Sequence, residues 1–547
     1  MAAARRASLV TWAVRSHRNG ALGLGLGLGL LVAITGPSYV AAAKAIAGGL
    51  ATLGAQAQPI AREFSFLTGP VARLDTIGGY LSYKVFGSIA LVVAIYAAVQ
   101  GSQVIRGSET KGLVDLWLAA GRTRGQILGD RTLSFGAALA GVVTAVYVGT
   151  GLSGALSGDQ LWLPAIGQCV AVYLVGAVAF GLALLASQFT RSARMAAALA
   201  TVYLVAAYFV ANVADSLGSL SLVCFLSPFF YYQHARTLVP GVGLDSVALA
   251  VLAAVALALA LVAWRLFRMR DTGGVAVAAR RRGHLPNYGL RPSRVARRWL
   301  WLNWVWEQRV GVASWCVGIF TLTAIEAAVV PTALNLIRSD RGTLRQLVSV
   351  ASLTEAQYVG FLLTFVVTVV AGFVVYEVGH WVGDASQHRT DAVLAQPVGL
   401  RHFVAARVAA LAAMSIALAT ALILGAAAGA AVGGYSLDGA GLMRAFLDTA
   451  LFGCSVGCVG LLAVALWRSG VATAVISALL VGCFFLTTIS ALLGWPSWSN
   501  RPSVFDAFGN PYLGWPSIGS LVYLGVLGAV CAVGSYLAMQ RGGRVAA

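Results

Sequence analysis

The chain has 547 residues, of which 59% are hydrophobic and 10% are charged, and its formal net charge is +19 at pH 7. Its mean hydropathy of +0.82 is far above what a water-soluble core needs, which excludes a soluble globular protein. The basic residues are spread along the chain instead of forming one basic face, so the composition also argues against a nucleic-acid-binding protein.

Twelve apolar segments are each long enough to cross a lipid bilayer, for which about 20 residues are required. They lie near residues 21–40, 82–101, 131–152, 164–186, 195–213, 245–266, 311–333, 358–381, 402–433, 446–467, 471–494 and 517–538. We therefore expect an all-α polytopic membrane protein with twelve transmembrane helices, arranged as six plus six.

Lysine and arginine are distributed unevenly between the two sides of these segments. The tails and loops on the side of the N-terminus carry 27 of them, and the loops on the other side carry nine. Positively charged loops tend to remain in the cytoplasm. The sequence therefore predicts a multi-pass protein of the cell membrane with both termini in the cytoplasm.

Two stretches on the basic side resemble each other at one constant spacing. "VDLWLAAGRTRGQILGDR" begins at Val114 and "TDAVLAQPVGLRHFVAAR" begins at Thr390. This repeat spacing pairs Asp115 with Asp391, Leu118 with Leu394, Ala119 with Ala395 and Arg131 with Arg407. Because the repeat spacing is close to half the chain length, we expect a duplicated six-span unit with both copies in the same orientation.

The duplication predicts three parts of the chain. Residues 1–266 form a first six-helix transmembrane half, residues 267–308 a cytoplasmic basic linker with an interfacial helix, and residues 309–547 a second six-helix transmembrane half. A basic, tryptophan-bearing segment precedes the first span of each half, which is typical of a helix lying at the membrane interface. Ordinary interfacial anchoring explains these segments equally well.

The first repeated stretch has too many charges to lie in the bilayer. Seven ionisable residues between Glu109 and Arg131 would cost about 20 kcal/mol there. Leu113, Leu116, Trp117 and Ala120 recur at helical spacing, so a short amphipathic cytoplasmic helix is predicted. Gly121 is expected to end it, and Pro397 to end its counterpart after Leu394.

Two segments on the opposite side also echo each other. "LSPFFYYQHART" contains Pro228 and Phe229, and "GNPYLGWPS" contains Pro511 and Tyr512. Both are too short to span a bilayer, so they are predicted to be short interfacial helices or re-entrant turns. Their four named residues are candidates for substrate binding or gating. A plain belt of interfacial aromatic residues is the alternative.

The sequence lacks the motifs of enzymatic sites. It has three lysines, none in a G-K-[ST] context, and neither H-E-x-x-H nor G-x-S-x-G occurs. Its seven cysteines include no C-x-x-C pair, which favours packing roles over a disulfide framework or a zinc site. We therefore expect no catalytic residue, metal or cofactor in this chain, and any ATP must be hydrolysed by a second polypeptide.

The stretch "DAVLAQPVGLRHFVAAR" resembles the membrane subunits of ABC-2-type exporters, in which a segment of the pattern L-A-x-P followed by a basic or polar turn docks on the ATPase. The first copy departs from this pattern because it has Ala120–Gly121 where the second has Gln396–Pro397. The double-length, twelve-span form is most similar to the permeases of tetronasin-type antibiotic and multidrug exporters.

The resemblance implies two tandem ABC-2-type halves in parallel orientation, each with a short cytoplasmic coupling helix. It also implies two copies of a separate ATPase subunit, which binds ATP and Mg²⁺, and export of a lipophilic small molecule such as an antibiotic or drug. Export of a lipid or glycan stays open. The implied ATPase-coupling residues are Asp115, Leu116, Trp117, Arg122, Asp391, Leu394, Gln396 and Pro397.

Other functions remain open. A proton-coupled carrier also has six plus six spans, and "GQILGDRTLSFG" partly mimics its loop signature. Glu326 would then be the first candidate for a proton path or a cationic drug, since ionisable residues within a membrane are often functional. Glu377 and His380 lie one helical turn apart and are predicted to bond to each other or to act in gating. A non-transporting membrane scaffold is a third possibility.

Overall fold

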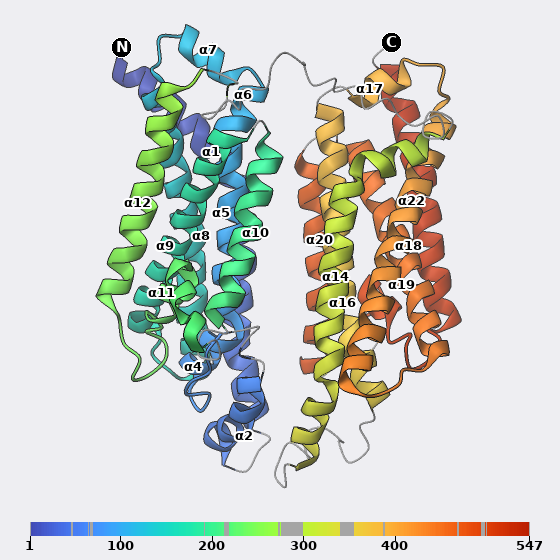
Figure 1. Cartoon of the computed structure of the whole chain (residues 1–547). Coiled ribbons are helices and arrows are strands. Elements are labelled where there is room, and N and C mark those ends of the chain that lie inside the picture. The colour runs from blue at the N-terminus through green and yellow to red at the C-terminus, as the bar shows by residue number, and fades with distance from the viewer. Residues whose placement is uncertain are drawn as a thin grey trace. The chain divides into compact units, whose positions relative to one another are not determined.

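A computed structural model describes most of the chain (Figure 1). The described residues are 2–44, 48–63, 65, 69–190, 192–212, 218–271, 274, 299–339, 355–386, 389–467, 470–493, 498 and 500–545. Throughout these residues the regular structure is helical. Most of the predicted linker, residues 275–298, lies outside them.

The chain divides into two compact units, which we call unit 1 and unit 2. The elements of unit 1 are α1 (Ala2–Lys44), α2 (Gly49–Glu63), α4 (Ile77–Leu81), η1 (Ser82–Phe86), α5 (Gly87–Ser102), η2 (Gln103–Gly107), α6 (Ser108–Thr110), α7 (Leu113–Ala119), α8 (Arg124–Ser157), α9 (Trp162–Phe189), α10 (Ala193–Asn212), η4 (Gly218–Leu226), α11 (Pro228–Gln233) and α12 (Ser246–Met269). Those of unit 2 are α14 (Leu300–Ser339), α16 (Glu355–Ser386), α17 (Arg389–Leu394), α18 (Leu400–Gly433), α19 (Gly439–Leu466), α20 (Gly470–Leu493), α21 (Val504–Phe508) and α22 (Ile518–Val545).

Eleven helices within the described residues are long and apolar enough to cross a membrane. They coincide with eleven of the twelve predicted spans, which confirms a polytopic membrane protein. The remaining predicted span, 471–494, falls on α20, of which Gly470–Phe484 is described as a shorter apolar helix. The basic segments that precede the first and seventh spans do not form separate helices, because α1 and α14 continue through them without a break.

The second span is longer than predicted and changes its winding twice. It runs from Ile77 to Thr110 and includes two π-helical stretches, η1 and η2. Each π-helical stretch inserts extra backbone into the helix and rotates the residues that follow, and such insertions are common at functional sites. The second one, η2, leads directly into α6 and α7.

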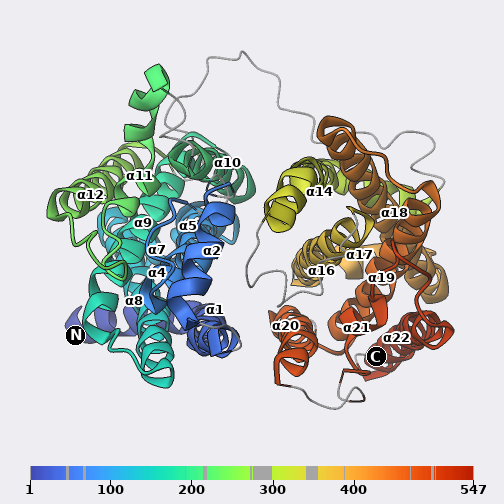
Figure 2. The same cartoon turned by 90° about the horizontal axis from the view of Figure 1, so that it is seen from below.

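Each unit packs around one central helix, as Figure 2 shows from below. In unit 1, α9 contacts α5, α8, α10 and α12, and in unit 2, α19 contacts α16, α18, α20 and α22. The core residues of these two helices are mostly small or β-branched, and Ala171, Val172 and Val175 of α9 are fully buried. Such residues allow membrane helices to approach closely.

Glycines allow the closest of these approaches. A Cβ atom built on Gly149 of α8 would lie 2.1 Å from the backbone oxygen of Gly29 in α1, and one on Gly429 of α18 would lie 2.2 Å from that of Ala324 in α14. A larger residue at either position would force the helices apart. The alternating glycines that begin at Gly23 are therefore partly packing residues, since Gly25 and Gly29 face α8.

Element boundaries recur at the repeat spacing defined by Asp115 and Asp391. Helices α8 and α18 both have 34 residues, both begin and end at equivalent positions, and each is followed by a left-handed glycine, Gly158 or Gly434. Helices α7 and α17 also begin at equivalent positions, Leu113 and Arg389. The spacing of the repeated stretches is therefore a spacing of structural elements as well.

Candidate functional site

The first repeated stretch forms a short helix at one end of unit 1, the end that also holds the start of α1 (Figure 1). Helix α7 ends as predicted at Gly121, which has a left-handed φ of 81°. The backbone N–H of Gly121 donates to Leu118 O at 2.9 Å and that of Arg122 to Trp117 O at 3.1 Å, which together form a Schellman motif. This motif fixes the direction in which the chain leaves α7.

Helix α8 starts immediately afterwards with a capping box. Thr123 Oγ1 accepts a hydrogen bond from the backbone N–H of Gln126, and Gln126 Oε1 accepts one from that of Thr123. Only Gly121 and Arg122 separate the end cap of α7 from this start cap. Because both helix ends have satisfied hydrogen bonds, the turn between them is well defined.

The buried face of α7 differs from the predicted one. Val114 is 1% exposed, and Trp117 and Leu118 pack against the core of unit 1. Leu116, which the predicted stripe placed on the buried face, is 64% exposed, and Asp115 beside it is also exposed. The buried face of α7 is therefore shifted by one residue toward the C-terminus. Asp115 and Leu116 lie on the face that does not pack against the core of unit 1.

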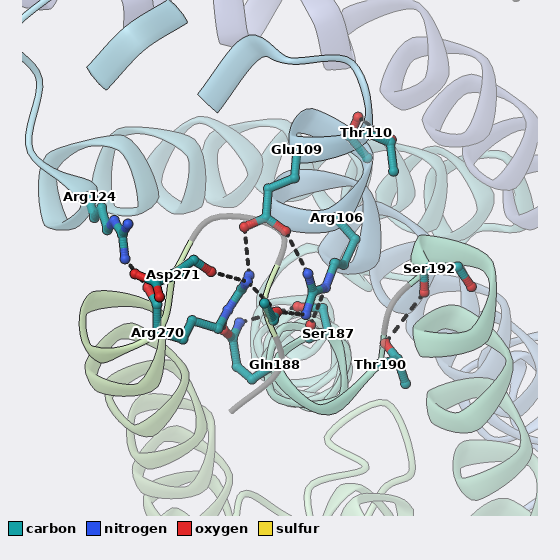
Figure 3. Close-up of polar contacts among 12 residues, drawn as sticks. Arg106, Glu109, Thr110, Arg124, Ser187, Gln188, Thr190, Ser192, Arg270 and Asp271 are labelled. Carbon is teal, nitrogen blue, oxygen red and sulfur yellow. Dashed lines mark hydrogen bonds and ion pairs between the residues drawn. The ribbon is translucent and has the colours of Figure 1, made fainter. Parts of the chain in front are cut away.

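A cluster of buried charges anchors the base of α7 (Figure 3). The carboxylate of Glu109 lies between two guanidinium groups and forms ion pairs of 2.8 Å with Arg106 and 2.8 Å with Arg270. All three side chains are at most 6% exposed. Burial lowers the pKa of the Arg270 guanidinium from its usual range, and the nearby Glu109 carboxylate opposes this shift.

The same cluster connects the ends of three membrane helices. Arg106 Nε donates to the backbone oxygen of Ser187 at 2.7 Å, and Arg270 Nε donates to Gln188 Oε1 at 2.8 Å. Ser187 and Gln188 are near the end of α9, and Arg270 directly follows α12. The segment before α7 is therefore connected to the ends of α9 and α12 by hydrogen bonds and ion pairs as well as through the chain.

Helix α8 contributes two further contacts. Arg122 in the turn forms a 2.9 Å ion pair with Asp130, which is 2% exposed. The guanidinium of the buried Arg131 lies 5.9 Å from the ring centroid of Trp117, a distance that permits a cation–π interaction. Two of the predicted coupling residues, Trp117 and Arg122, thus join α7 to α8.

In unit 2 the counterpart helix α17 is shorter and more exposed. It ends at Leu394, and Pro397 follows in the turn before α18. Asp391, Gln396 and Pro397 are exposed, whereas Leu394 and the neighbouring Val393 pack against the core of unit 2.

Arg407 stabilises the base of this second segment. It pairs with Asp384 at the end of α16 (3.1 Å) and lies 4.0 Å from the ring centroid of Trp304 in α14. Arg407 occupies the position equivalent to Arg131, and both side chains are buried. Each unit therefore has a buried arginine beside an aromatic ring at the base of its short helix.

Three further carboxyl groups, Glu377, Glu326 and Asp448, lie within membrane helices of unit 2. Glu377 is fully buried and accepts a hydrogen bond from Gln308 of α14 at 3.0 Å. The predicted bond between Glu377 and His380 stays a prediction. Glu326 in α14 has a buried Oε2 atom without a hydrogen-bond partner.

Sequence reasoning missed a third carboxyl group, Asp448 of α19. It is 2% exposed, and both of its carboxylate oxygens are buried without a hydrogen-bond partner. The sequence did contain a signal for Asp448, because an acidic residue stands well inside an apolar helix there. Glu109 and Arg270 were missed for another reason, because they lie far apart in the sequence and meet only in the folded chain.

The two echoing segments at the other end of each unit contain short helices, α11 and α21, but their residues are paired differently from the prediction. Ser227 caps α11 and donates to Ala207 O, and Ser503 caps α21 and donates to Cys483 O. Ser227 and Ser503 again stand at the repeat spacing, so Pro228 and Phe229 correspond to Val504 and Phe505 and not to Pro511 and Tyr512. All four predicted residues are buried, which argues against a simple aromatic belt.

Pro511 and Tyr512 form a turn that is held by Arg444. The guanidinium of Arg444 donates to Pro511 O at 3.1 Å and to Tyr512 O at 2.9 Å, and Tyr512 Oη accepts a hydrogen bond from the backbone N–H of Asp438. These contacts connect the turn before α22 to the start of α19. They are consistent with a structural role for both residues.

The contacts described above connect helix ends to one another. Within the described residues no group of three His, Cys, Asp or Glu side chains is placed to hold a metal ion. The polar groups are instead paired at helix ends or isolated within membrane helices. Such an arrangement is suited to moving helices relative to one another.

A comparison with known protein families gives a match over most of the chain. A family model described as "Multidrug efflux system permease Rv1217c, C-terminal domain" matches residues 7–268 and 302–539. These residues include most of the helices of both units. A search of curated proteins found no match.

Proposed function

Since the chain belongs to the family of multidrug efflux system permeases, we propose that it is the membrane subunit of an ATP-driven exporter of the ABC-2 type. The proposed molecule has twelve transmembrane helices in two tandem, parallel halves, lies in the cell membrane and has both termini in the cytoplasm. The chain itself would carry no catalytic residue. Two copies of a separate ATPase would bind and hydrolyse ATP with Mg²⁺.

The observation that carries this proposal is the way α7 is held. The helix exposes Asp115 and Leu116, while its two ends are fixed by the Schellman motif and by the cluster around Glu109. An exposed surface on a firmly held helix is what a partner protein needs in order to move the membrane helices. Helix α17 exposes Asp391 in the equivalent place.

The substrate proposal rests on the family and on the membrane helices. The family name is that of a multidrug permease, and the spans are strongly apolar. We infer a lipophilic antibiotic or drug, as in the tetronasin-type exporters that the chain resembles. Export of a lipid or glycan is the alternative.

The experiment is co-purification of the full-length permease with its ATPase. The expected partner carries the G-x-x-x-x-G-K-[ST] motif and is present at two copies per permease chain. Asp115→Arg combined with Asp391→Arg should abolish co-purification and drug export. Asp159→Arg, an exposed charge reversal in the loop between α8 and α9, should change neither and serves as the control.

A proton-coupled carrier is the second candidate, and the buried carboxyl groups of Glu326 and Asp448 favour it. Transport into inverted membrane vesicles separates the two. An exporter of the proposed kind accumulates drug on addition of ATP when its ATPase is present, without a pH gradient. Accumulation driven by a pH gradient alone, and lost in Glu326→Gln, would replace the ATP-driven proposal.

A further inference from the structure

A groove of about 560 Å³ lies between α8 and α12, at the α7 end of unit 1. Its floor is formed by Gly125, Gly129 and Leu133, which follow one face of α8, and its far wall by Trp264. A Cβ atom built on Gly129 would meet no atom within 4 Å. The missing side chains of α8 therefore create the space.

The groove carries a net positive charge. Arg124 and Arg268 both line it, and the guanidinium of Arg268 lies 4.6 Å from the centre of the Trp264 ring. The one acid in its lining, Asp130, is already paired with Arg122. Arg124 donates one hydrogen bond to Arg270 O, which leaves other N–H groups of its guanidinium for a ligand.

Unit 2 has a groove in the corresponding place. It measures about 520 Å³ and lies between α18 and α22. Three of its lining residues, Arg401, Ala405 and Ala409, are the repeat equivalents of Gly125, Gly129 and Leu133 in the first groove. It also contains a cation, Arg401. The guanidinium of Arg401 lies 5.8 Å from the ring centre of Tyr536, which lines the same groove.

The dimensions and chemistry of the second groove suit one kind of molecule. Its α18 wall runs from Arg401 to Ala412 and, apart from Arg401, is entirely apolar. A helical segment of this length extends about 16 Å, close to the roughly 15 Å depth of half the hydrocarbon core of a bilayer. A cation at one end and an apolar trough of this length match an anionic head group and an acyl chain.

We propose that each groove binds one anionic phospholipid. The phosphate lies against Arg124, Arg268 and Trp264 in unit 1 and against Arg401 in unit 2, and an acyl chain follows the small residues of α8 or α18. The first lipid lies beside the turn between α7 and α8, so it also stabilises the base of the coupling segment. This binding does not depend on the proposed ATP-driven transport.

The test is native mass spectrometry of the full-length protein released from detergent, with phosphatidylglycerol or phosphatidylcholine added at equal concentrations. The wild type should retain up to two phosphatidylglycerol molecules in preference to phosphatidylcholine. Inorganic phosphate should not compete, because it lacks the acyl chain. Arg124→Gln with Arg268→Gln should remove one of the two and weaken that site about tenfold or more, since it loses charge-assisted hydrogen bonds.

Two filling variants test the same sites without altering a charge. Gly129→Phe should remove the lipid of unit 1 and Ala405→Phe that of unit 2, and the combination should retain neither. Arg194→Gln, an exposed arginine on α10, is the matched control and should keep both. Thermal unfolding of each variant identifies those that fail to fold. If the charge variant of unit 1 fails to fold, the filling variant tests the same groove, and the reverse also holds.

Three results would overturn the proposal. Equal retention of the two lipids would remove the preference for an anionic head group. Unchanged retention in both filling variants would show that the lipids bind elsewhere. Competition by inorganic phosphate would indicate an anion site without a lipid.

Discussion

Among single residues, Glu109 has the largest predicted effect on stability. It is the one carboxylate between the buried arginines Arg106 and Arg270. In Glu109→Gln both guanidinium groups stay buried without their counter-charge, which costs about 3–5 kcal/mol of unfolding free energy for a buried ion pair. Equilibrium unfolding in mixed micelles would measure this loss.

The control for Glu109 is a glutamate that is not enclosed. Glu307 is exposed and accepts a hydrogen bond from Asn303, so Glu307→Gln should change the free energy of unfolding by less than about 0.5 kcal/mol. A small loss in Glu109→Gln as well would mean that water compensates the two arginines, and that the cluster does not anchor α7.

Replacing Asp448 with an apolar residue should raise the free energy of unfolding, whereas replacing Glu109 lowers it. Both carboxylate oxygens of Asp448 are buried without a hydrogen-bond partner. The central helix of unit 1, α9, has an apolar residue, Ala171, at the same distance from its end. Asp448→Val removes the unsatisfied group and should raise the unfolding free energy by about 1–3 kcal/mol. The same unfolding assay, together with a drug-efflux assay, shows whether the carboxyl group is kept for transport.

A matched change on the same helix gives the opposite sign. Asp438 caps α19 by accepting hydrogen bonds from the backbone N–H groups of Ala440 and Gly441, so Asp438→Ala should destabilise by about 1 kcal/mol. If Asp448→Val destabilised by a similar amount, Asp448 would have a partner in the folded protein, and its oxygens would not be unsatisfied.

For helical elements, the rigidity of the α7 turn is the property to test. Gly121 and Gly158 both have left-handed φ angles, 81° and 79°, and both have open space where a Cβ would lie. Alanine should therefore cost each helix end about 1 kcal/mol. Only Gly121→Ala should also reduce drug efflux and co-purification of the ATPase, because Gly158 ends α8 at its other end.

Efflux from whole cells and thermal unfolding of the purified protein measure these two effects separately. Equal losses of efflux in Gly121→Ala and Gly158→Ala would attribute the effect to stability alone. The geometry of the turn would then have no part in coupling.

The elements that the sequence predicted well are those in which apolar length decides the structure. Helices α8 and α18 fill and extend the predicted spans 131–152 and 402–433, because a bilayer-crossing segment has to be helical. Helix α2 was not predicted, since its apolar residues form no span. The buried face of α7 was misplaced by one position, because in so short a helix the tertiary contacts of Val114 decide which side is buried.

The candidate site was predictable only in part. Composition and spacing located both short helices and their ends at Gly121 and Leu394. The charges that hold α7 were not predictable, because Glu109 and Arg270 meet through the packing of α9 against α12. Contacts between residues so distant in sequence depend on the whole fold.

At the scale of the whole molecule, the described residues contain two large hydrophobic cores, besides a small cluster around Tyr39. One large cluster of buried residues extends over α1 to α12, and the other over α14 to α22. Each has its own central helix, and each has its own buried arginine beside the short helix. A unit with its own core has the main requirement for folding by itself.

This organisation predicts that the chain tolerates a break between α12 and α14. When residues 1–284 and 285–547 are produced as two polypeptides in the same cells, each should insert, resist proteolysis and retain its thermal unfolding midpoint within a few degrees, because no buried contact of either core is cut. A break within α9 after Val175 divides the core of unit 1 and should abolish its protease resistance. If the break between α12 and α14 were equally damaging, the two cores would depend on each other, and the permease would fold as a single unit.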